Sequence, residues 1–513
     1  MFWSIFNTLP NNNVNVDWYT NLFNPAQVWC EILNNNLSIK DRRFSNPLWQ
    51  DNGIYQYIAN SYMFMCSQAL ENVKNLEIKD NEKSKYTFFL KQYLEAVSPS
   101  NFIFSNPQAI QAIIDSKGQS IVDGMVNYLE DMQKGRISQS KDGAFVIGEN
   151  VACTSGDVIK KTPLYELIRY HNSNIKYKNP ILIIPPCINK YYILDLQPHN
   201  SLVKFLTDSG FDVYLMSWRN IKVEDNLNFS WDDYVAAVQE CILNIQQVHV
   251  MGFCIGGTIA SCAIADLDKK HAKQVASLSL LTTLLDFEES GILGQMMDET
   301  QFNYKKHSYN KNDVMTGQEL GCIFNSLRPQ ELVWKYVNEN YLQGKQPASF
   351  DILHWNNDST NLPANMYCWY IENTYIKNNL IKKQAVINNK PLDLNNINTP
   401  IYAVGCEEDH IVPWAGALKS IHHLSQTNQD INFILSSSGH IAGIINPINN
   451  SKRYYYKYEN ISDSHISPSE KIQGSWWSNW LEWLESKSKI NKTSKSENHY
   501  QALYPAPGEY VKS

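Results

Sequence analysis

The chain has 513 residues, more than one hydrophobic core usually covers, so we expect two domains or one elaborated domain. Hydrophobic residues make up 43% of the chain and charged residues 19%, which excludes general disorder. The net charge of −7 is small for this length and gives no reason to expect nucleic acid as a partner.

The opening residues, MFWSIFNTLPNNN, lack the basic and apolar segments of a secretory signal. No run of about 18 apolar residues occurs, so we expect no transmembrane segment. The ten cysteines are scattered singly, without a CxxC pair or a Cys/His spacing typical of zinc sites. We therefore expect no metal, and free thiols in a reducing cytoplasm.

Residues 1 to about 150 carry apolar side chains at helical spacing, which predicts a helical N-terminal domain. This domain either packs on its neighbour or binds a partner or surface, and the sequence leaves both roles open. The periodic segments are Asp17–Leu37, Tyr55–Val73, Lys85–Val97 and Ala109–Met132.

From about residue 175, short runs of Ile, Val and Leu alternate with helical stretches. Buried parallel strands have this appearance, because both of their faces are covered. We therefore predict an α/β domain over residues 151–490 with a mostly parallel, doubly wound sheet. The apolar runs are Ile181–Ile184, Val213–Met216, Val248–Met251, Leu278–Leu281, Ile401–Val404 and Phe433–Leu435.

The strand pattern lapses between about 285 and 395, in a stretch rich in aromatic residues. An insertion at this place would form a helical cap above the carboxyl edge of the sheet, or an ordinary helical excursion. Trp355 and Trp369 lie in it and either line a channel or pack in the core. Residues 491–513 contain Pro505 and Pro507 and are expected to form an extended tail.

The most informative segment runs from Val248 through Gly252-Phe253-Cys254-Ile255-Gly256. An apolar strand leads into G-x-C-x-G, and a helix of small residues follows. This pattern is the nucleophile elbow of the α/β-hydrolase fold, with Cys in place of Ser. The glycines allow strand, turn and helix to approach closely, and the helix N-terminus favours a thiolate. We predict that Cys254 is the nucleophile of an α/β-hydrolase-fold enzyme.

In this fold an acid and then a histidine follow later strands. Asp409 follows the apolar run Ile401–Val404, and His440 follows Phe433–Leu435. The order therefore predicts Asp409 as the acid and His440 as the base. The competing residues are Glu407 and Glu408 for the acid and His410 for the base.

Acyl transfer gives each predicted residue a role. His440 takes the proton of Cys254, and Asp409 orients the imidazole and stabilises its cation. The backbone N–H of Ile255 lines the oxyanion hole, and a second N–H comes from Cys187 or Ile188, with Ile188 preferred. No metal has a part in this scheme.

A cysteine at the elbow favours transfer over hydrolysis. A thiol that attacks a thioester exchanges one sulfur for another at nearly equal energy, so the acyl group stays activated. A serine would form a more stable ester. We therefore expect a thioester as the acyl donor.

Long, collinear segments of the chain resemble the polyhydroxyalkanoate synthases of class I, from about residue 95 to the C-terminus. Asp195, in the first of these segments, is either a site residue or an anchor for its loop. The segments are Pro185–Pro198, Ser217–Asn220, Gly252–Gly257, Leu281–Phe287, Asn361–Pro363, Tyr367–Tyr370, Glu408–Trp414, Gly439–Gly443 and Pro505–Lys512, with Asp41–Phe44 and Trp49 before them.

The resemblance implies polymerisation of (R)-3-hydroxyacyl-CoA, such as 3-hydroxybutyryl-CoA, into a polyester with release of CoA. It implies Cys254, Asp409 and His440 as the catalytic residues, with the aspartate also acting on the substrate 3-hydroxyl. It further implies a homodimer in the cytoplasm, at the surface of polymer granules and in contact with granule-associated proteins. No cofactor is expected, since CoA is part of the substrate.

Two other functions stay open at this point. A Cys-dependent acyl-CoA thioesterase on the same fold would release free acid instead of polymer. A catalytically inactive scaffold would bind granules and lose nothing when Cys254 is replaced, although the intact order of the triad argues against it.

Overall fold

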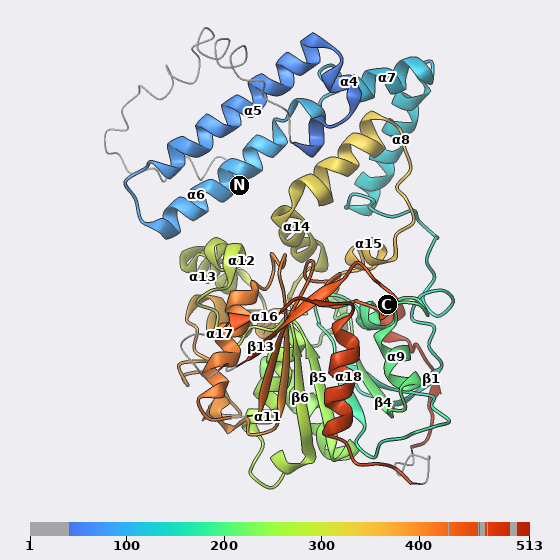
Figure 1. Cartoon of the computed structure of the whole chain (residues 1–513), viewed down its shortest axis with the longest axis vertical. Helices are drawn as coiled ribbons and strands as arrows, with labels where there is room; N and C mark the ends of the chain where they lie inside the picture. Colours follow the sequence, from blue (N-terminus) through green and yellow to red (C-terminus); the bar gives the residue numbers. More distant parts are fainter. Residues whose placement is uncertain (1–40, 429, 460, 462–466, 469, 493–499) are drawn as a thin grey trace. The chain divides into compact units, whose positions relative to one another are not determined.

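The computed structural model describes residues 41–513 except 429, 460, 462–466, 469 and 493–499 (Figure 1). The predicted helix Asp17–Leu37 lies outside the described residues. Two compact units make up the chain: residues up to Ile137 together with Arg328–Gln346, and Ser138–Leu327 together with Pro347–Ser513. Residues 328–346, which the sequence pattern places in the insertion, therefore belong to the first unit. Within the described chain, no helix is both long and apolar enough to cross a membrane.

Helices build the first unit, as the periodicity predicts. Asparagine side chains begin several of them: Asn52 accepts the N–H of Ile54, and Asn106 accepts that of Gln108. Such caps satisfy N–H groups that have no partner within the helix. The elements are η1 (Arg42–Phe44), α4 (Pro47–Gln50), α5 (Gly53–Lys74), α6 (Asp80–Ala96), η2 (Pro99–Asn101), α7 (Pro107–Asp115), α8 (Gln119–Lys134), η6 (Gln330–Trp334) and η7 (Val337–Leu342).

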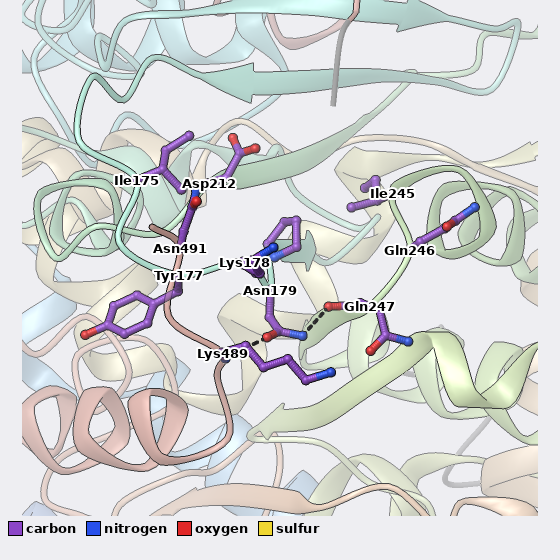
Figure 2. A pocket seen from close by; sticks show the side chains of 11 residues that line it. Ile175, Tyr177, Lys178, Asn179, Asp212, Ile245, Gln246, Gln247, Lys489 and Asn491 are labelled. Atoms are coloured by element: carbon purple, nitrogen blue, oxygen red, sulfur yellow. Dashed lines mark hydrogen bonds between the residues drawn. The ribbon is translucent and has the colours of Figure 1, made fainter. Parts of the chain in front are cut away.

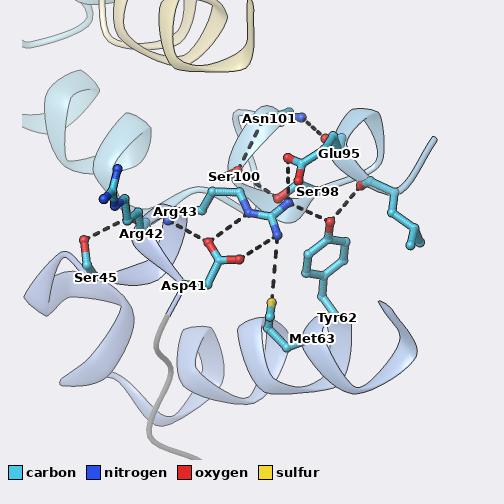
Figure 3. Close-up of polar contacts among 11 residues, drawn as sticks. Asp41, Arg42, Arg43, Ser45, Tyr62, Met63, Glu95, Ser98, Ser100 and Asn101 are labelled. Atoms are coloured by element: carbon cyan, nitrogen blue, oxygen red, sulfur yellow. Dashed lines mark hydrogen bonds and ion pairs between the residues drawn. The ribbon is translucent and has the colours of Figure 1, made fainter. Parts of the chain in front are cut away.

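Arg43 joins the start of the described chain to α5 and α6 (Figure 3). Its guanidinium binds the Asp41 carboxylate through two nitrogens, at 2.7 and 3.0 Å, and reaches Glu95 at 3.0 Å. It also donates to the hydroxyl of Tyr62 at 2.8 Å. Next to it, Phe44 is fully buried. These contacts give Arg43 a structural role, because its charge is matched by two carboxylates.

The α8 helix carries its apolar side chains on the outside. Its buried residues are polar or small, and Asn127 donates to the carbonyl of Asn340 in η7 at 2.9 Å. Asp131 accepts the hydroxyl of Tyr341 at 2.7 Å. This polar packing leaves an exposed apolar surface, the α8 face. It consists of Ile121, Val122, Met125, Val126, Leu129 and Met132.

A sheet of twelve strands organises the described part of the second unit. Its strands are β1 (Gly156–Lys161), β2 (Tyr165–Tyr170), β3 (Ile181–Ile184), β4 (Val213–Trp218), β5 (Val248–Phe253), β6 (Val275–Leu281), β11 (Ile401–Cys406), β12 (Ile431–Ser436), β13 (Tyr454–Glu459), β14 (Ser467–Pro468), β15 (Ile472–Gln473) and β16 (Tyr504–Pro505). The order is β14-β13-β12-β11-β6-β5-β3-β4-β2-β1-β16, with β15 paired to β13. From β4 through β3 to β12 the strands run parallel, and every predicted apolar run is one of them.

Helices cover both faces of this sheet (Figure 1). The predicted doubly wound arrangement is therefore confirmed. Strand residues alternate between two cores: Leu182 and Val250 belong to the core under one set of helices, and Ile183 and Met251 to the other. The first set comprises α10 (Trp231–Ile245), α11 (Ile255–Asp266) and α17 (Trp414–Ser425), and the second comprises α9 (Leu202–Asp208) and α18 (Trp476–Ser486).

The C-terminal residues are fastened to the antiparallel end of the sheet. Glu166 on β2 is fully buried, and its carboxylate accepts the hydroxyl of Tyr504 at 2.6 Å. The same carboxylate accepts the backbone N–H groups of Glu509 and Tyr510 at 3.0 and 3.1 Å. Since a buried carboxylate needs donors, these bonds hold the tail in place.

The predicted insertion lies between β6 and β11 and is mainly helical. Trp355 and Trp369 pack in or against the protein core: Trp355 donates to the carbonyl of Lys190 at 2.6 Å, and Trp369 stacks on Trp231 at 4.8 Å. In the second unit its elements are α12 (Gly291–Met296), α13 (Glu299–Ser308), β7 (Val314–Met315), α14 (Gly317–Leu327), α15 (Asp351–Asn356), β8 (Leu362–Pro363), α16 (Ala364–Ile371), η8 (Glu372–Ile376), β9 (Val386–Ile387), β10 (Lys390–Pro391) and η9 (Leu394–Asn396).

A cavity of about 230 Å³ lies where β3 and β5 begin (Figure 2). Asn179 bridges its walls: its amide donates to the carbonyl of Gln247 at 2.8 Å and accepts the N–H of Lys489 at 2.9 Å. Ligands of open α/β sheets bind at the carboxyl ends of the strands, the opposite edge. We therefore expect the active site at the carboxyl edge of the sheet.

Candidate active site

Cys254 stands at a strained turn between β5 and α11. Its φ and ψ angles are 53° and −126°, a backbone conformation that non-glycine residues rarely adopt. Two glycines make the turn possible, because a Cβ at Gly252 would overlap Gly257 and a Cβ at Gly256 would overlap the carbonyl of Ile184. The Cys254 side chain is half-buried, at the N-terminus of α11. This is the geometry that the G-x-C-x-G motif predicts.

Asp409 and His440 meet through their side chains, although 31 residues separate them. His440 Nδ1 lies 2.7 Å from Asp409 Oδ2. The other carboxylate oxygen, Oδ1, accepts the backbone N–H groups of Ile411 and Val412 at 2.9 and 2.8 Å. These two bonds fix the carboxylate, so the imidazole is held in one orientation.

Two neighbours, Asp409 and Cys254, act on the pKa of His440. Burial alone would lower the pKa of His440, but the negative charges of Asp409 and Cys254 raise it above its usual range. Phe253, the neighbour of the nucleophile, stacks on the imidazole with ring centres 5.4 Å apart. The arrangement places the imidazole of His440 where it can accept the proton of Cys254.

The predicted oxyanion donors lie beside Cys254. Ile255 is the first residue of α11, and the first N–H groups of a helix have no partner within it. Ile188 lines the same cavity as Cys254, and its carbonyl accepts the N–H of Thr360 at 2.8 Å. Cys187 is buried next to it, and burial first, then the charge of Cys254, raises the pKa of its thiol. The choice between Cys187 and Ile188 as second donor stays a prediction.

The competing residues have other surroundings. Glu407 accepts the hydroxyl of Tyr454 at 2.8 Å, and Glu408 is exposed. Asp195 anchors its loop: it accepts the hydroxyls of Thr154 and Ser201 at 2.5 and 2.7 Å. The structure thus brings together Cys254, His440 and Asp409 and leaves these carboxylates outside the constellation.

A small apolar cavity of about 60 Å³ opens onto Cys254. The insertion supplies much of its wall, so these segments lie beside the nucleophile. Sequence reasoning did not assign a role to Tyr370, Tyr375 or Phe253, since aromatic residues in apolar stretches are usually core. The lining includes Ile188, Ile255, Thr258, Leu284, Leu293, Met297, Leu320, Phe324, Tyr367, Tyr370, Tyr375 and Val412.

Comparisons with known proteins agree with this geometry. Residues 40–206 match the family model "Poly-beta-hydroxybutyrate polymerase (PhaC) N-terminus", and residues 180–447 match that of the alpha/beta hydrolase fold. The poly(3-hydroxyalkanoate) polymerase subunit PhaC of Cupriavidus necator is 38% identical over 495 residues, which cover 93% of this chain and 83% of that protein. The poly(3-hydroxyalkanoate) polymerase of Methylorubrum extorquens is 33% identical over 491 residues, covering 92% and 80%.

Proposed function

Because the chain belongs to the poly(3-hydroxyalkanoate) polymerase family and is an acyltransferase, we propose that it polymerises (R)-3-hydroxyacyl-CoA through an acyl-enzyme at Cys254. The observation that supports this mechanism is the strained elbow at Cys254 beside the buried pair of His440 and Asp409. We take 3-hydroxybutyryl-CoA as the substrate, because the cavity at Cys254 is small. No resident metal or cofactor takes part in the scheme.

In the first step the Cys254 thiolate attacks the thioester carbonyl of the substrate. A carbon–sulfur bond to Cys254 forms, the bond to CoA breaks, and the imidazolium of His440 gives its proton to the departing CoA. The carbonyl oxygen is negative in the transition state, where the N–H groups of Ile255 and of the loop at Ile188 would bind it. Asp409 stabilises the imidazolium until the proton leaves.

In the second step the 3-hydroxyl of another acyl-CoA attacks the acyl group on Cys254. An oxygen–carbon bond forms, the bond to the Cys254 sulfur breaks, and the hydroxyl proton passes to His440. The lengthened chain is now a CoA thioester, and Cys254 attacks it again with release of CoA. Covering segments that exclude water favour this attack over hydrolysis.

We also place the enzyme in the cytoplasm at the surface of polymer granules, as a homodimer in contact with granule-associated proteins. The α8 face supports the granule contact, because a helix that buries polar residues and exposes six apolar ones fits an apolar surface. The sides of α8 carry carboxylates such as Asp123 and Glu130, which disfavour anionic lipid.

A single assay tests the proposed function. The purified chain is mixed with (R)-3-hydroxybutyryl-CoA, and CoA release is followed together with turbidity. The proposal predicts CoA release with formation of insoluble polyester, and loss of both in Cys254→Ala. Release of CoA with only soluble 3-hydroxybutyrate would instead identify a thioesterase. Unchanged polymer formation by Cys254→Ala would remove Cys254 from the mechanism.

The granule contact has its own test in the inactive Cys254→Ala chain. Co-sedimentation with poly(3-hydroxybutyrate) particles measures binding without new polymer. Replacing Val122 and Leu129 by Asp should weaken binding about tenfold, because two exposed apolar side chains would become charged. Glu130→Gln on the same helix is the matched control and should bind as before. Equal binding by the Asp variant would exclude the α8 face.

A further inference from the structure

Two tyrosines of the insertion reach the cavity at Cys254. Tyr370 and Tyr375 both line it, although most of its other walls are aliphatic. Both rings contact Phe287, at 6.0 and 4.9 Å between ring centres. A phenylalanine would serve equally well for such packing, whereas a buried tyrosine hydroxyl needs a hydrogen-bond partner.

A π-helical turn brings the two phenols together. Five residues along an α-helix rotate a side chain by about 140° relative to the first, so Tyr370 and Tyr375 would face different ways. Here η8 follows α16 directly, and Lys377 donates to the carbonyl five residues before it. This wider turn rotates each residue by less than an α-helix does, and the two rings lie with their centres 6.0 Å apart.

Side chains of the same segment stabilise the π turn through hydrogen bonds. A wider turn frees backbone carbonyls from their usual helical partners. The Asn373 amide donates to the carbonyl of Trp369 at 2.9 Å, and the Thr374 hydroxyl donates to that of Tyr370 at 2.5 Å. Because these bonds compensate the lost helical ones, the turn is a specified feature, and such turns occur often at functional sites.

The two phenol rings lie edge to face, with ring centres 6.0 Å apart, and both line the cavity. Each hydroxyl acts on the pKa of the other phenol. Two hydroxyls carry two protons, and a hydrogen bond between them would use one, so one donor would remain for the cavity. Burial first, then nearby charge, raises the pKa of both phenols, which keeps them neutral donors at neutral pH.

The neighbours of the two phenols differ. The charges of Cys254 and Asp409 both act on Tyr375, whereas those of Cys254 and Cys187 act on Tyr370. Tyr375 thus lies on the acid side of the nucleophile. The predicted oxyanion donors are on the other side, at the start of α11 and in the loop after β3.

We propose that the hydroxyl of Tyr375 contacts the 3-oxygen of the incoming hydroxyacyl group and places it for attack on the Cys254 thioester. The proposal rests on the proposed function, in which that oxygen gives its proton to His440. Tyr375 supplies one hydrogen bond and orients the nucleophile, and it takes no part in the attack of Cys254 on CoA thioesters.

The test separates the two steps in Tyr375→Phe. Butyryl-CoA lacks the 3-hydroxyl, so it can acylate Cys254 once and cannot extend a chain. Rapid-quench measurement of CoA release should give the same acylation burst as the parent chain, which also shows that the variant is folded. Steady-state polymerisation of (R)-3-hydroxybutyryl-CoA should be at least about tenfold slower in kcat.

Tyr304→Phe is the matched control, since Tyr304 lies on α13 of the same insertion but is exposed and does not line the cavity. It should change neither rate. Equal slowing of both steps in Tyr375→Phe, or of neither, would overturn the proposal. If the parent chain gives no butyryl burst, the proposed function itself fails. Cys254→Ala cannot be acylated at residue 254, so it gives the baseline against which a burst of the parent chain is measured.

Discussion

Two buried histidines near opposite ends of β5 have pKa values shifted in opposite directions. At its amino end, His249 is buried and its ring nitrogens lie 2.7 and 2.9 Å from the hydroxyls of Ser277 and Ser488. Burial lowers the pKa of His249 to about 3. Beyond its carboxyl end, His440 is buried as deeply, but it faces Asp409 and Cys254, and its pKa is raised.

The difference teaches that the partner, and not burial, makes a histidine a catalytic base. Desolvation acts in the same direction on both rings, since it disfavours the charged form. Neutral hydroxyls cannot offset that cost, whereas a fixed carboxylate can. A buried histidine is therefore a candidate base only where a charged group compensates its cation. Substitutions around His440 should change catalysis, whereas substitutions at or around His249 should change stability.

The largest effect is expected when His440 is given a neutral partner. Asp409→Asn removes the charge that stabilises the imidazolium, so the pKa of His440 falls and the imidazole becomes a weaker base toward Cys254. The rate of CoA release from (R)-3-hydroxybutyryl-CoA should fall about 100-fold or more.

Glu407→Gln is the control for this change, because Glu407 lies on the same loop but pairs with Tyr454. It should keep nearly full activity. A full rate in Asp409→Asn, or equal losses in the two variants, would show that Asp409 does not act through His440.

An intermediate effect is expected from the aromatic neighbours. Phe253 stacks on His440 at 5.4 Å, and Phe211 packs edge-on against His249 at 6.2 Å. Phe253→Leu should lower kcat about tenfold, because the imidazole loses one of the contacts that orient it. Phe211→Leu should destabilise the fold without changing kcat per folded molecule. Steady-state rates, normalised by the folded fraction, check both, and equal kcat losses would refute the distinction.

The smallest effect concerns stability and pH. His249 has a pKa of about 3 when folded and about 6.5 when unfolded. Between these values the unfolded state binds the proton, so stability falls as pH falls, by up to about 1.4 kcal/mol per pH unit. His249→Gln should have a shallower loss of unfolding free energy between pH 6.5 and 5, measured by urea denaturation. A slope identical to that of the parent chain would contradict the neutral state of His249.

The catalytic strands and the order of the site residues follow from the sequence, because both depend on short-range patterns. Ile181–Ile184 is β3 residue for residue, and the glycines around Cys254 predict the strained turn. The antiparallel strands β1, β2 and β13 were missed, since their mixed polar and apolar residues resemble loops as much as strands.

Other features depend on contacts far apart in the chain. Residues 328–346 join the first unit through pairs such as Asn127 with Asn340, which no local pattern indicates. The π turn that aligns Tyr370 and Tyr375 has no periodicity of its own. His249 appears in the sequence as one polar residue in an apolar strand, and its burial and its contacts with serines 28 and 239 residues away depend on the tertiary fold.

The most direct test of the central claim is the identity of the acylated residue. The enzyme is mixed with (R)-3-hydroxybutyryl-CoA, quenched in acid within the first turnover and digested, and the peptides are analysed by mass spectrometry. We expect a hydroxybutyryl adduct on Cys254, in reduced amount in Asp409→Asn. An adduct on another residue, or continued CoA release with no adduct on Cys254, would contradict it.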